Sequence, residues 1–232
     1  MKIEVWSDVY CPFCYIAEAR LEKALAKYQK GDQVELVFRS FELDPSLPVD
    51  QSYPARDYLA LKYQLTQEQA QAQLDAITNL AKEEGLDFRF DQAWIPNSRK
   101  SHALLHLAIE QGLGRDMAQL LFQAHFTRGL DLGQDSVLEK LAQELGLDGD
   151  LVVEALESET YQKRIEADQE AGLALGIQAV PFFLFDGRFS IAGAQPQAVF
   201  EEALEKAFGL ETKPVSLGSS AMTCGLNGCS IE

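Results

Sequence analysis

Hydrophobic and polar residues alternate at the start of the chain and then change to a helical period. Residues 1–6 (MKIEVW) alternate as a half-buried strand does. From Ile16 to Tyr28, apolar residues recur every three or four positions as far as Gly31, which predicts a helix. A second alternating segment, residues 34–41, predicts another strand. The chain therefore opens with a β-α-β unit.

A long helical stretch follows the break at residues 44–48 (DPSLP) and continues for roughly 110 residues. Thr66 and Gln69 have the spacing of a capping box ahead of a helix that reaches residues 84–85. Asp135 is predicted to cap a helix that Gly146 closes. The remaining predicted helices end at Gly112 and Gly129 or cover residues 151–156 and 159–175.

Strand patterns return near the end of the chain. Residues 182–185 and 188–191 flank an Asp186-Gly187 turn signal, which predicts a hairpin, and a last helix follows over residues 196–208. Without the helical block, the order is β-α-β then α-β-β-α, that of thioredoxin. We therefore expect an α/β thioredoxin-like domain over residues 1–48 and 158–210. A helical insertion domain would occupy residues 49–157, and a flexible C-terminal tail residues 211–232.

The composition narrows the class of protein. The chain has 232 residues, 47% of them hydrophobic, and a formal net charge of −16. This acidity argues against nucleic acid or an anionic membrane surface as a partner, because both would repel the chain. No run of 18 apolar residues and no signal-peptide pattern is present. We expect a cytoplasmic protein.

Four cysteines form two close pairs, separated by the cysteine-free residues 15–223. Paired cysteines in a reducing cytosol are usually catalytic, regulatory or metal-bound. Cys11-Pro12-Phe13-Cys14 lies where the first strand becomes a helix, with Pro12 suited to the first helical position. The helix N-terminus is expected to favour the thiolate form of Cys11. We expect Cys11 to be an exposed nucleophile and Cys14 a shielded resolving thiol.

A zinc site is the main alternative for these cysteines. Cys11 and Cys14 could be half of such a site, with Cys224 and Cys229 as the other half. Structural zinc sites usually place C-x-x-C in a knuckle between short strands and not at the head of a long amphipathic helix. We therefore predict no metal and no bound cofactor, and keep a metal-binding or redox-sensing protein as the non-enzyme alternative.

Two motifs together resemble the DsbA-like thioredoxin superfamily, and within it the cytoplasmic FrnE-type oxidoreductases. They are residues 6–15 (WSDVYCPFCY) and residues 179–183 (AVPFF), on either side of the helical insertion. The resemblance implies a thiol–disulfide oxidoreductase that acts on thiol- or disulfide-containing proteins. It also implies a cis Val180–Pro181 bond beside the redox pair, with the main chain of Val180 offered to a bound peptide. Pro12 and Phe13, between the cysteines, are the further candidates for substrate contact.

Phe13 departs from the periplasmic members, which have histidine at that position. Because phenylalanine cannot stabilise a thiolate electrostatically, the resemblance implies a weaker oxidant. Kappa-class glutathione transferases and 2-hydroxychromene-2-carboxylate isomerases are similar to this chain at Asn97-Ser98 and His102, but they typically carry serine in place of Cys11. A glutathione-dependent transferase or isomerase is therefore the alternative enzyme, and glutathione a candidate thiol partner.

Polar residues near these motifs have simpler interpretations. Asn97 either helps to shape the cleft or caps a helix together with Ser98. For His102, His106 and His125 we prefer satisfied packing residues, because the spacing lacks the carboxylate of a zinc protease.

Asp8, three residues before Cys11, has two interpretations of equal weight. It either accepts a proton from Cys14 or caps a turn.

The C-terminal tail carries the second cysteine pair. Residues 216–220 (SLGSS) are typical of a flexible linker and lead to Cys224 and Cys229 in a glycine-containing loop. With no helical or strand pattern around them, these cysteines are not expected in the core. We predict an accessory redox pair that exchanges with Cys11. The alternative is a frayed terminus with two idle cysteines.

Overall fold

The computed structural model describes residues 1–29, 31–209, 222–225 and 228–230. The linker predicted over residues 216–220 lies outside the described residues. A four-stranded sheet forms the centre of the molecule, in the order β2-β1-β6-β7. The strands are β1 (Lys2–Ser7), β2 (Glu35–Ser40), β6 (Phe182–Phe185) and β7 (Phe189–Ala192). β1 runs parallel to β2 and antiparallel to β6, so the first β-α-β unit and the final hairpin share one sheet.

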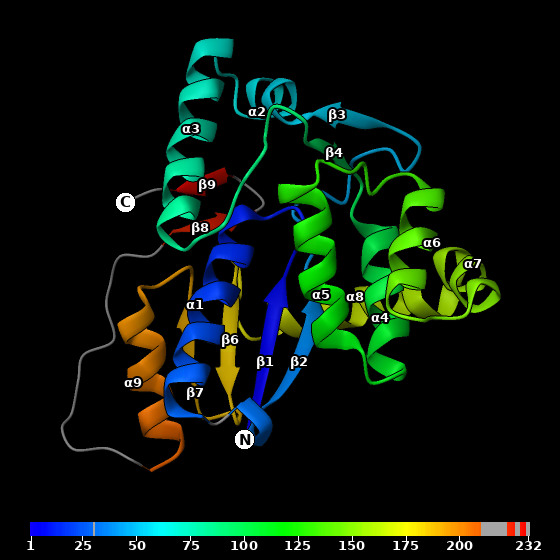
Figure 1. Ribbon diagram of the computed structural model, residues 1–232. Helices are drawn as coiled ribbons and strands as arrows, with labels where there is room; N and C mark the ends of the chain where they lie inside the picture. Colours follow the sequence, from blue (N-terminus) through cyan, green and yellow to red (C-terminus); the bar gives the residue numbers. More distant parts are fainter. Residues whose placement is uncertain (30, 210–221, 226–227, 231–232) are drawn as a thin grey trace.

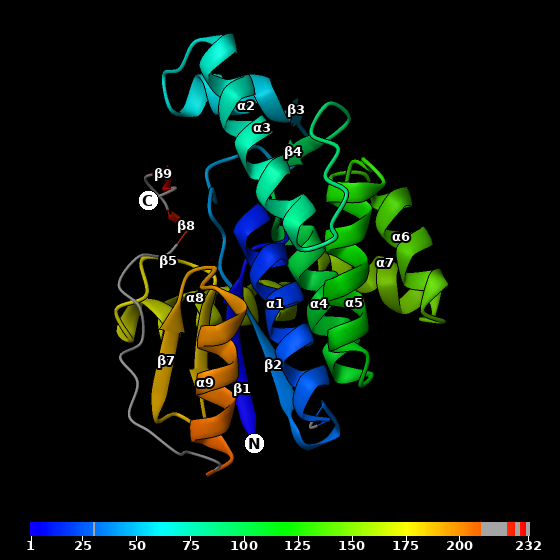
Figure 2. The same cartoon turned by 60° about the vertical axis from the view of Figure 1, so that its left-hand side comes forward.

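Helices cover both faces of this sheet (Figures 1 and 2). α1 (Pro12–Tyr28) and α9 (Gln197–Ala207) lie side by side on one face and are joined by the ion pair of Lys27 and Glu201. α8 (Glu159–Ala174) packs behind β1 and β2 on the other face, where the indole of Trp6 donates to the Asp168 carbonyl at 2.9 Å. This is the thioredoxin fold that the element order predicted.

The insertion between β2 and α8 is mainly helical. Its helices are α2 (Ala55–Lys62), α3 (Gln67–Glu83), α4 (Arg99–Glu110), α5 (Gly114–Phe122), the π-helix η2 (Gln123–Thr127), α6 (Asp135–Glu144) and α7 (Gly149–Glu157). The capping box is confirmed, since Thr66 and Gln69 exchange side-chain and backbone hydrogen bonds at the start of α3. Asp135 was wrongly predicted as a cap, because it is the first residue of α6 and Gln134 holds the N-cap position.

Short strands are the elements that the sequence pattern did not predict. β3 (Ser52–Pro54) and β4 (Trp94–Pro96) pair antiparallel inside the predicted helical block. β5 (Ala179–Val180) pairs with β8 (Thr223–Gly225), which pairs in turn with β9 (Gly228–Ser230). A single 3₁₀ turn, η1 (Gly31–Gln33), precedes β2. The prediction that Cys224 has no strand context is therefore wrong.

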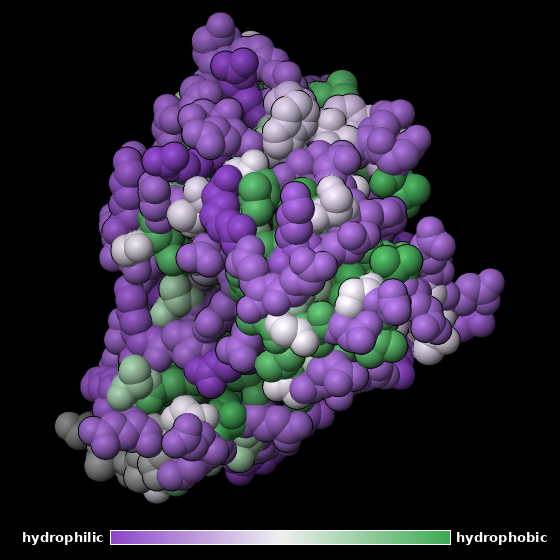
Figure 3. Space-filling model, turned by 45° about the vertical axis from the view of Figure 1, so that its right-hand side comes forward, coloured by the Kyte–Doolittle hydropathy of each residue, from purple (hydrophilic) through white to green (hydrophobic). Residues whose placement is uncertain are grey.

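One continuous hydrophobic core joins the sheet to the insertion. Phe183 and Phe200 meet edge-to-face between β6 and α9, while Phe88, Phe122 and Phe126 pack with Tyr15 of α1. The surface face shown in Figure 3 is mostly hydrophilic, with hydrophobic side chains gathered in strips between the charged ones. In the described part of the chain, no helix is both long and apolar enough to cross a membrane.

Candidate active site

Cys11 and Cys14 lie at the N-terminus of α1, beyond the end of β1. Cys11 is the N-cap residue with an extended backbone (φ −84°, ψ 111°), and Pro12 is the first helical residue. The Cys14 N–H donates to the Cys11 carbonyl at 3.0 Å, and the Cys11 side chain makes no capping hydrogen bond to the helix. Both thiols are free. The positive end of the helix dipole therefore lies at the Cys11 sulfur, where it favours a thiolate.

The two thiols do not differ in solvent exposure as predicted. Cys11 is 0% exposed and Cys14 is 2% exposed, so the expectation of an exposed nucleophile is wrong for this structure. Burial raises the pKa of Cys14 well above its usual value, and so do the hydrogen bond and the charge of Cys11. Bonds from the Ser7 hydroxyl and the Asp8 backbone act in the opposite direction. Cys14 is thus held as a neutral thiol.

The loop before β6 approaches the redox pair from the opposite side. The Val180–Pro181 peptide bond is cis, and the Cys11 thiol donates to the Val180 carbonyl at 3.8 Å. Val180 and Pro181 are both buried. The structure therefore brings the two motifs that are far apart in the sequence into direct contact.

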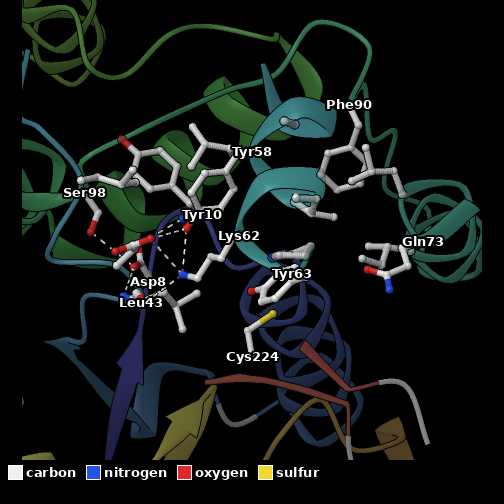
Figure 4. Close-up of a pocket in the computed structure, with 18 of the residues that line it drawn as sticks. Asp8, Tyr10, Leu43, Tyr58, Lys62, Tyr63, Gln73, Phe90, Ser98 and Cys224 are labelled. Carbon is white, nitrogen blue, oxygen red and sulfur yellow. Dashed lines mark hydrogen bonds and ion pairs between the residues drawn. The ribbon is translucent and has the colours of Figure 1, made fainter. Parts of the chain in front are cut away.

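The C-terminal hairpin covers this loop. In β8, Cys224 pairs with Val180 across an antiparallel ladder, and it is only 1% exposed. Cys224 is disulfide-bonded, and Cys229 faces it in the β8–β9 register, although the Cys229 side chain lies outside the described part. Figure 4 shows the Cys224 side chain beside Tyr63, the residue that follows α2. The expectation that these cysteines stay outside the core is wrong for Cys224, because pairing with β5 buries it.

Asp8 is 1% exposed and joins three segments. Its carboxylate accepts from the backbone N–H of Tyr10 at 3.2 Å and of Leu43 at 2.7 Å, and from the Ser98 hydroxyl at 3.3 Å. The bond to Tyr10, two residues on, is the turn-capping contact. The group that reaches Cys14 is the backbone of Asp8, as described above. The geometry therefore favours the turn-capping interpretation of Asp8.

The three histidines are all buried, as packing residues are. His106 contacts the Ser40 hydroxyl at 3.1 Å, and burial lowers its pKa to about 4. His125 lies edge-on to Tyr10, and burial lowers its pKa to about 3. His102 lies 3.7 Å from Asp8, but neither of its ring nitrogens has a hydrogen-bond partner among the described residues. The prediction that the hydrogen bonds of His102 are satisfied is therefore wrong. The same holds for His125.

Asn97 and Ser98 divide their roles at the start of α4. Asn97 accepts from the Arg99 N–H at 2.9 Å and donates to the Leu47 carbonyl at 2.8 Å. Ser98 occupies the N-cap position but uses its hydroxyl on Asp8 and not on the helix. Asn97 therefore supports the turn into α4, and Ser98 ties α4 to the redox loop.

A cavity of about 70 Å³ lies between the start of α1 and helices α2 and α3 (Figure 4). Pro12, Tyr63 and Cys224 line it on the side of the redox pair. On another wall Lys62 pairs with Asp44 at 3.1 Å. Burial, followed by the charges of Cys11 and Asp44, raises the pKa of Tyr63 to about 12. Phe13 is 0% exposed in the core, whereas Pro12 borders the cavity. Contact of either residue with substrate stays a prediction.

Sequence reasoning missed Ser7 and Tyr63. Ser7 ends β1, and its hydroxyl bonds to Cys14. Tyr63 follows α2 and reaches the site only because the insertion folds over α1. Ser7 could have been predicted, because it stands at the end of the strand, four residues before Cys11. Nothing in the sequence around Tyr63 indicates that it reaches the redox pair.

Comparison with known proteins places this geometry in a family. The model of the DsbA-like thioredoxin domain matches residues 2–205. An uncharacterized protein of Bacillus subtilis, YwbO, is 34% identical over 206 residues, covering 88% of this chain and 96% of that protein. The crystal structure of a probable DsbA oxidoreductase from Streptomyces coelicolor is 38% identical with a TM-score of 0.84. It covers 100% of this chain and 99% of its own.

A more distant structure shares the fold alone. The cytosolic disulfide reductase DsbM of Pseudomonas aeruginosa is 21% identical with a TM-score of 0.66, covering 91% of this chain and all of its own. DsbM has also been solved with glutathione.

Proposed function

The chain belongs to the DsbA-like thioredoxin-domain family, and we propose that it is a thiol–disulfide oxidoreductase with Cys11 and Cys14 as its redox pair. One observation carries the proposal. Cys11 is a free thiol at the N-cap of α1, three residues from free Cys14, with its sulfur 3.8 Å from the carbonyl of Val180. Within the family we propose the FrnE-type branch, on the resemblance carried by residues 6–15 and 179–183.

The two cysteines have different roles in the proposed reaction. In the oxidising direction a substrate thiolate attacks Cys11 of the Cys11–Cys14 disulfide, and Cys14 leaves and takes up a proton. A second substrate thiolate then attacks the mixed disulfide, which releases the Cys11 thiolate and the oxidised substrate. Reduction is the reverse. The raised pKa of Cys14 favours its protonation as a leaving group, while the helix terminus stabilises the thiolate of Cys11.

The substrate would bind as an additional strand on β5. Val180 presents its main chain beside Cys11, and a peptide that pairs there brings its own cysteine to the sulfur. In this structure β8 holds that position, with Cys224 directly opposite Val180. A protein substrate therefore has to displace β8 before it reaches Cys11, which is completely buried.

The same placement supports an accessory role for the tail. The Cys11 thiolate would attack the disulfide of Cys224, forming a Cys11–Cys224 bond and releasing the partner thiolate, for which Cys229 is our candidate. Cys14 would then displace Cys224, leaving a Cys11–Cys14 disulfide and a dithiol tail. Two electrons pass from the active-site pair to the tail, and no further reactant is needed.

We favour disulfide exchange over a glutathione-dependent transferase or isomerase, because a transferase needs no resolving thiol and Cys14 lies beside Cys11. Glutathione is proposed as a thiol partner, in line with the DsbM structure that contains it. A cytoplasmic location and protein dithiol substrates complete the proposal. Asp8 is proposed mainly as the anchor of the redox loop.

Trapping of mixed disulfides tests the redox pair. Purified Cys14→Ser should accumulate covalent adducts on Cys11 with disulfide-bonded insulin, because the resolving thiol of Cys14 is missing. Cys11→Ser should form none and should lose insulin reduction with dithiothreitol. Adducts that form on Cys14 in Cys11→Ser at the rate seen for Cys11 would show that the roles are reversed.

Truncation tests the tail separately. A chain that ends at Lys213 keeps Cys11 and Cys14 and should turn over insulin, but its redox titration should lose one two-electron step. The Cys11→Ala/Cys14→Ala double variant is the matched control, since it keeps only the tail pair. An unchanged titration, with no Cys11–Cys224 bond found by mass spectrometry, would refute the accessory role and leave the main proposal standing.

A further inference from the structure

Glu18 is a buried carboxyl group that takes no part in the redox site. It lies on α1, is 5% exposed, and neither of its oxygens has a hydrogen-bond partner among the described residues. The Gln119 amide approaches it without reaching hydrogen-bonding geometry. A buried carboxyl without a hydrogen-bond partner destabilises the folded state. The surroundings of Glu18 indicate what could compensate this carboxyl group.

Glu18 borders an open cleft of about 560 Å³ between α1, α5 and η2, with its two carboxyl oxygens buried beneath the surface. Two further acids, Glu22 and Asp116, line the same cleft. No lysine, arginine or histidine lines it in the part of the chain that the structure describes. Arg115, which lies nearby on α5, is committed to Glu22 by a two-pronged ion pair. The cleft thus presents net negative charge around one unpartnered carboxyl.

The other walls of the cleft are hydrocarbon and amide. Tyr15 stacks on Phe122 at 5.1 Å and forms an aromatic wall, and Leu120 and Leu145 form aliphatic ones. The amides of Gln119 and Gln123 lie at the rim. This lining suits a cation that carries an apolar chain, because carboxylates and an aromatic ring attract the charge while the aliphatic walls cover the methylenes.

Other ligand classes fit less well. An anion would meet three carboxyl groups, and the nearby guanidinium of Arg115 is already paired with Glu22. For a metal ion, the described residues contain no group of three or more His, Cys, Asp or Glu side chains arranged to hold one. An ammonium group needs only one or two carboxylates and tolerates an amide rim. The chain's net charge of −16 would also attract cations to this surface.

We propose that this cleft binds an alkylammonium group, with Glu18 as the carboxylate that pairs with the cation. Asp116 supplies additional negative charge, and Tyr15 contacts the alkyl chain. The shared chemistry is a primary amine on a hydrocarbon chain, whether it comes from a free polyamine or from a lysine of a protein. This site is independent of the redox pair.

Binding should release a proton. Burial, and then repulsion by Glu22, raise the pKa of Glu18 to about 8, against the opposing effects of Arg115 and Gln119. The empty site is therefore mostly protonated at pH 7, and the cation requires the carboxylate. With a pKa of about 8, affinity should rise ~25-fold between pH 6.5 and pH 8.5 and level off above. Tyr15, whose pKa burial raises, stays neutral over this range.

Isothermal titration of the full chain with spermidine and with cadaverine tests the site. We expect binding that Glu18→Gln weakens at least tenfold, with proton release at pH 7 shown by comparing buffers of different ionisation enthalpy. Glu170→Gln is the matched control, because it removes the same charge from an exposed position on α8 and should leave binding unchanged. Asp116→Asn, at an exposed position, provides a second variant if Glu18→Gln fails to fold, and it should weaken binding severalfold.

A short peptide with one lysine, and the same peptide with acetyllysine, distinguish the source of the amine. Tighter binding of the lysine peptide than of the polyamines supports a protein partner, and the reverse supports a free polyamine. The proposal is overturned if no amine binds, if Glu170→Gln weakens binding as much as Glu18→Gln does, or if Mg²⁺ or Ca²⁺ binds in a Glu18-dependent manner while the amines do not.

Discussion

Gly225 offers a way to loosen the C-terminal hairpin without touching a cysteine. A Cβ at this position would lie 2.9 Å from the Gln178 carbonyl oxygen and 3.4 Å from the Ala179 Cβ, and the first of these contacts is with backbone. Its φ lies outside the left-handed region, so alanine is excluded by the close approach of β5 and not by backbone strain. Gly225→Ala should therefore push β8 away from β5.

The size of the effect follows from what the displacement breaks. β5 and β8 are paired at two positions, Ala179–Gly225 and Val180–Cys224. A backbone hydrogen bond contributes a net ~0.5–1.5 kcal/mol. Losing two of them lowers the free energy of opening by ~1–3 kcal/mol, which raises the open population ~5- to 150-fold. Because Cys11 is 0% exposed, reagents reach it only from the open state.

Alkylation of Cys11 by iodoacetamide measures this opening. Fully reduced protein is labelled at neutral pH, and the peptide containing Cys11 is followed by mass spectrometry. Gly225→Ala should label at least fivefold faster than the unmodified chain. Gly149→Ala is the control, because no atom lies within 4 Å of its added Cβ. Labelling of Gly225→Ala at the unmodified rate would refute the argument that β8 controls access to Cys11.

Three further predictions concern stability. Burial lowers the pKa of His106 to about 4 and of His125 to about 3. As the pH falls below ~6.5, these two histidines therefore take up protons in the unfolded chain before they do so in the folded chain. Stability at pH 5 should then be ~2 kcal/mol lower per histidine than at pH 7 in urea titrations, a loss that His125→Gln should reduce. Asp168→Asn should lower the unfolding free energy by ~2–4 kcal/mol, because Asp168 accepts from the Ser40 N–H and pairs with Arg39; an unchanged urea midpoint would contradict this. Thr66→Ala should cost ~1 kcal/mol through the loss of the capping box, and Thr66→Ser, which keeps the hydroxyl, should restore most of it.

Elements with a strong local signal were predictable from the sequence. The alternation in residues 1–6 and 34–41 became β1 and β2, and the Asp186-Gly187 signal became a turn with positive φ at both residues. The Cys11–Cys14 pair was placed correctly at a helix N-terminus, because proline and the change of period mark that point. Local patterns therefore gave the central sheet, α1 and the position of the thiols.

The features that failed depend on contacts between distant residues. β3 and β4 are three residues each, too short to show a period, and each forms only by pairing with the other. Cys224 has glycine and small polar neighbours, and its burial results from pairing with Val180, 44 residues earlier in the chain. Cys11 also contacts a distant segment, since its thiol donates to the carbonyl of Val180, 169 residues later in the chain.

The position of β8 connects substrate access to the state of the tail. β5 is a short strand whose backbone groups lie beside the redox sulfur, and an unpaired edge of this kind recruits any extended peptide. Here the edge is held by a strand of the same chain, so its pairing with β5 is intramolecular and competes with any peptide from solution. A peptide that binds β5 more weakly than this is excluded from Cys11. On the proposed function, the tail therefore determines which substrates reach Cys11, in addition to accepting electrons from the Cys11–Cys14 pair. Only a substrate able to replace β8 on Val180, or the Cys224 disulfide already seated there, gains contact with the Cys11 sulfur.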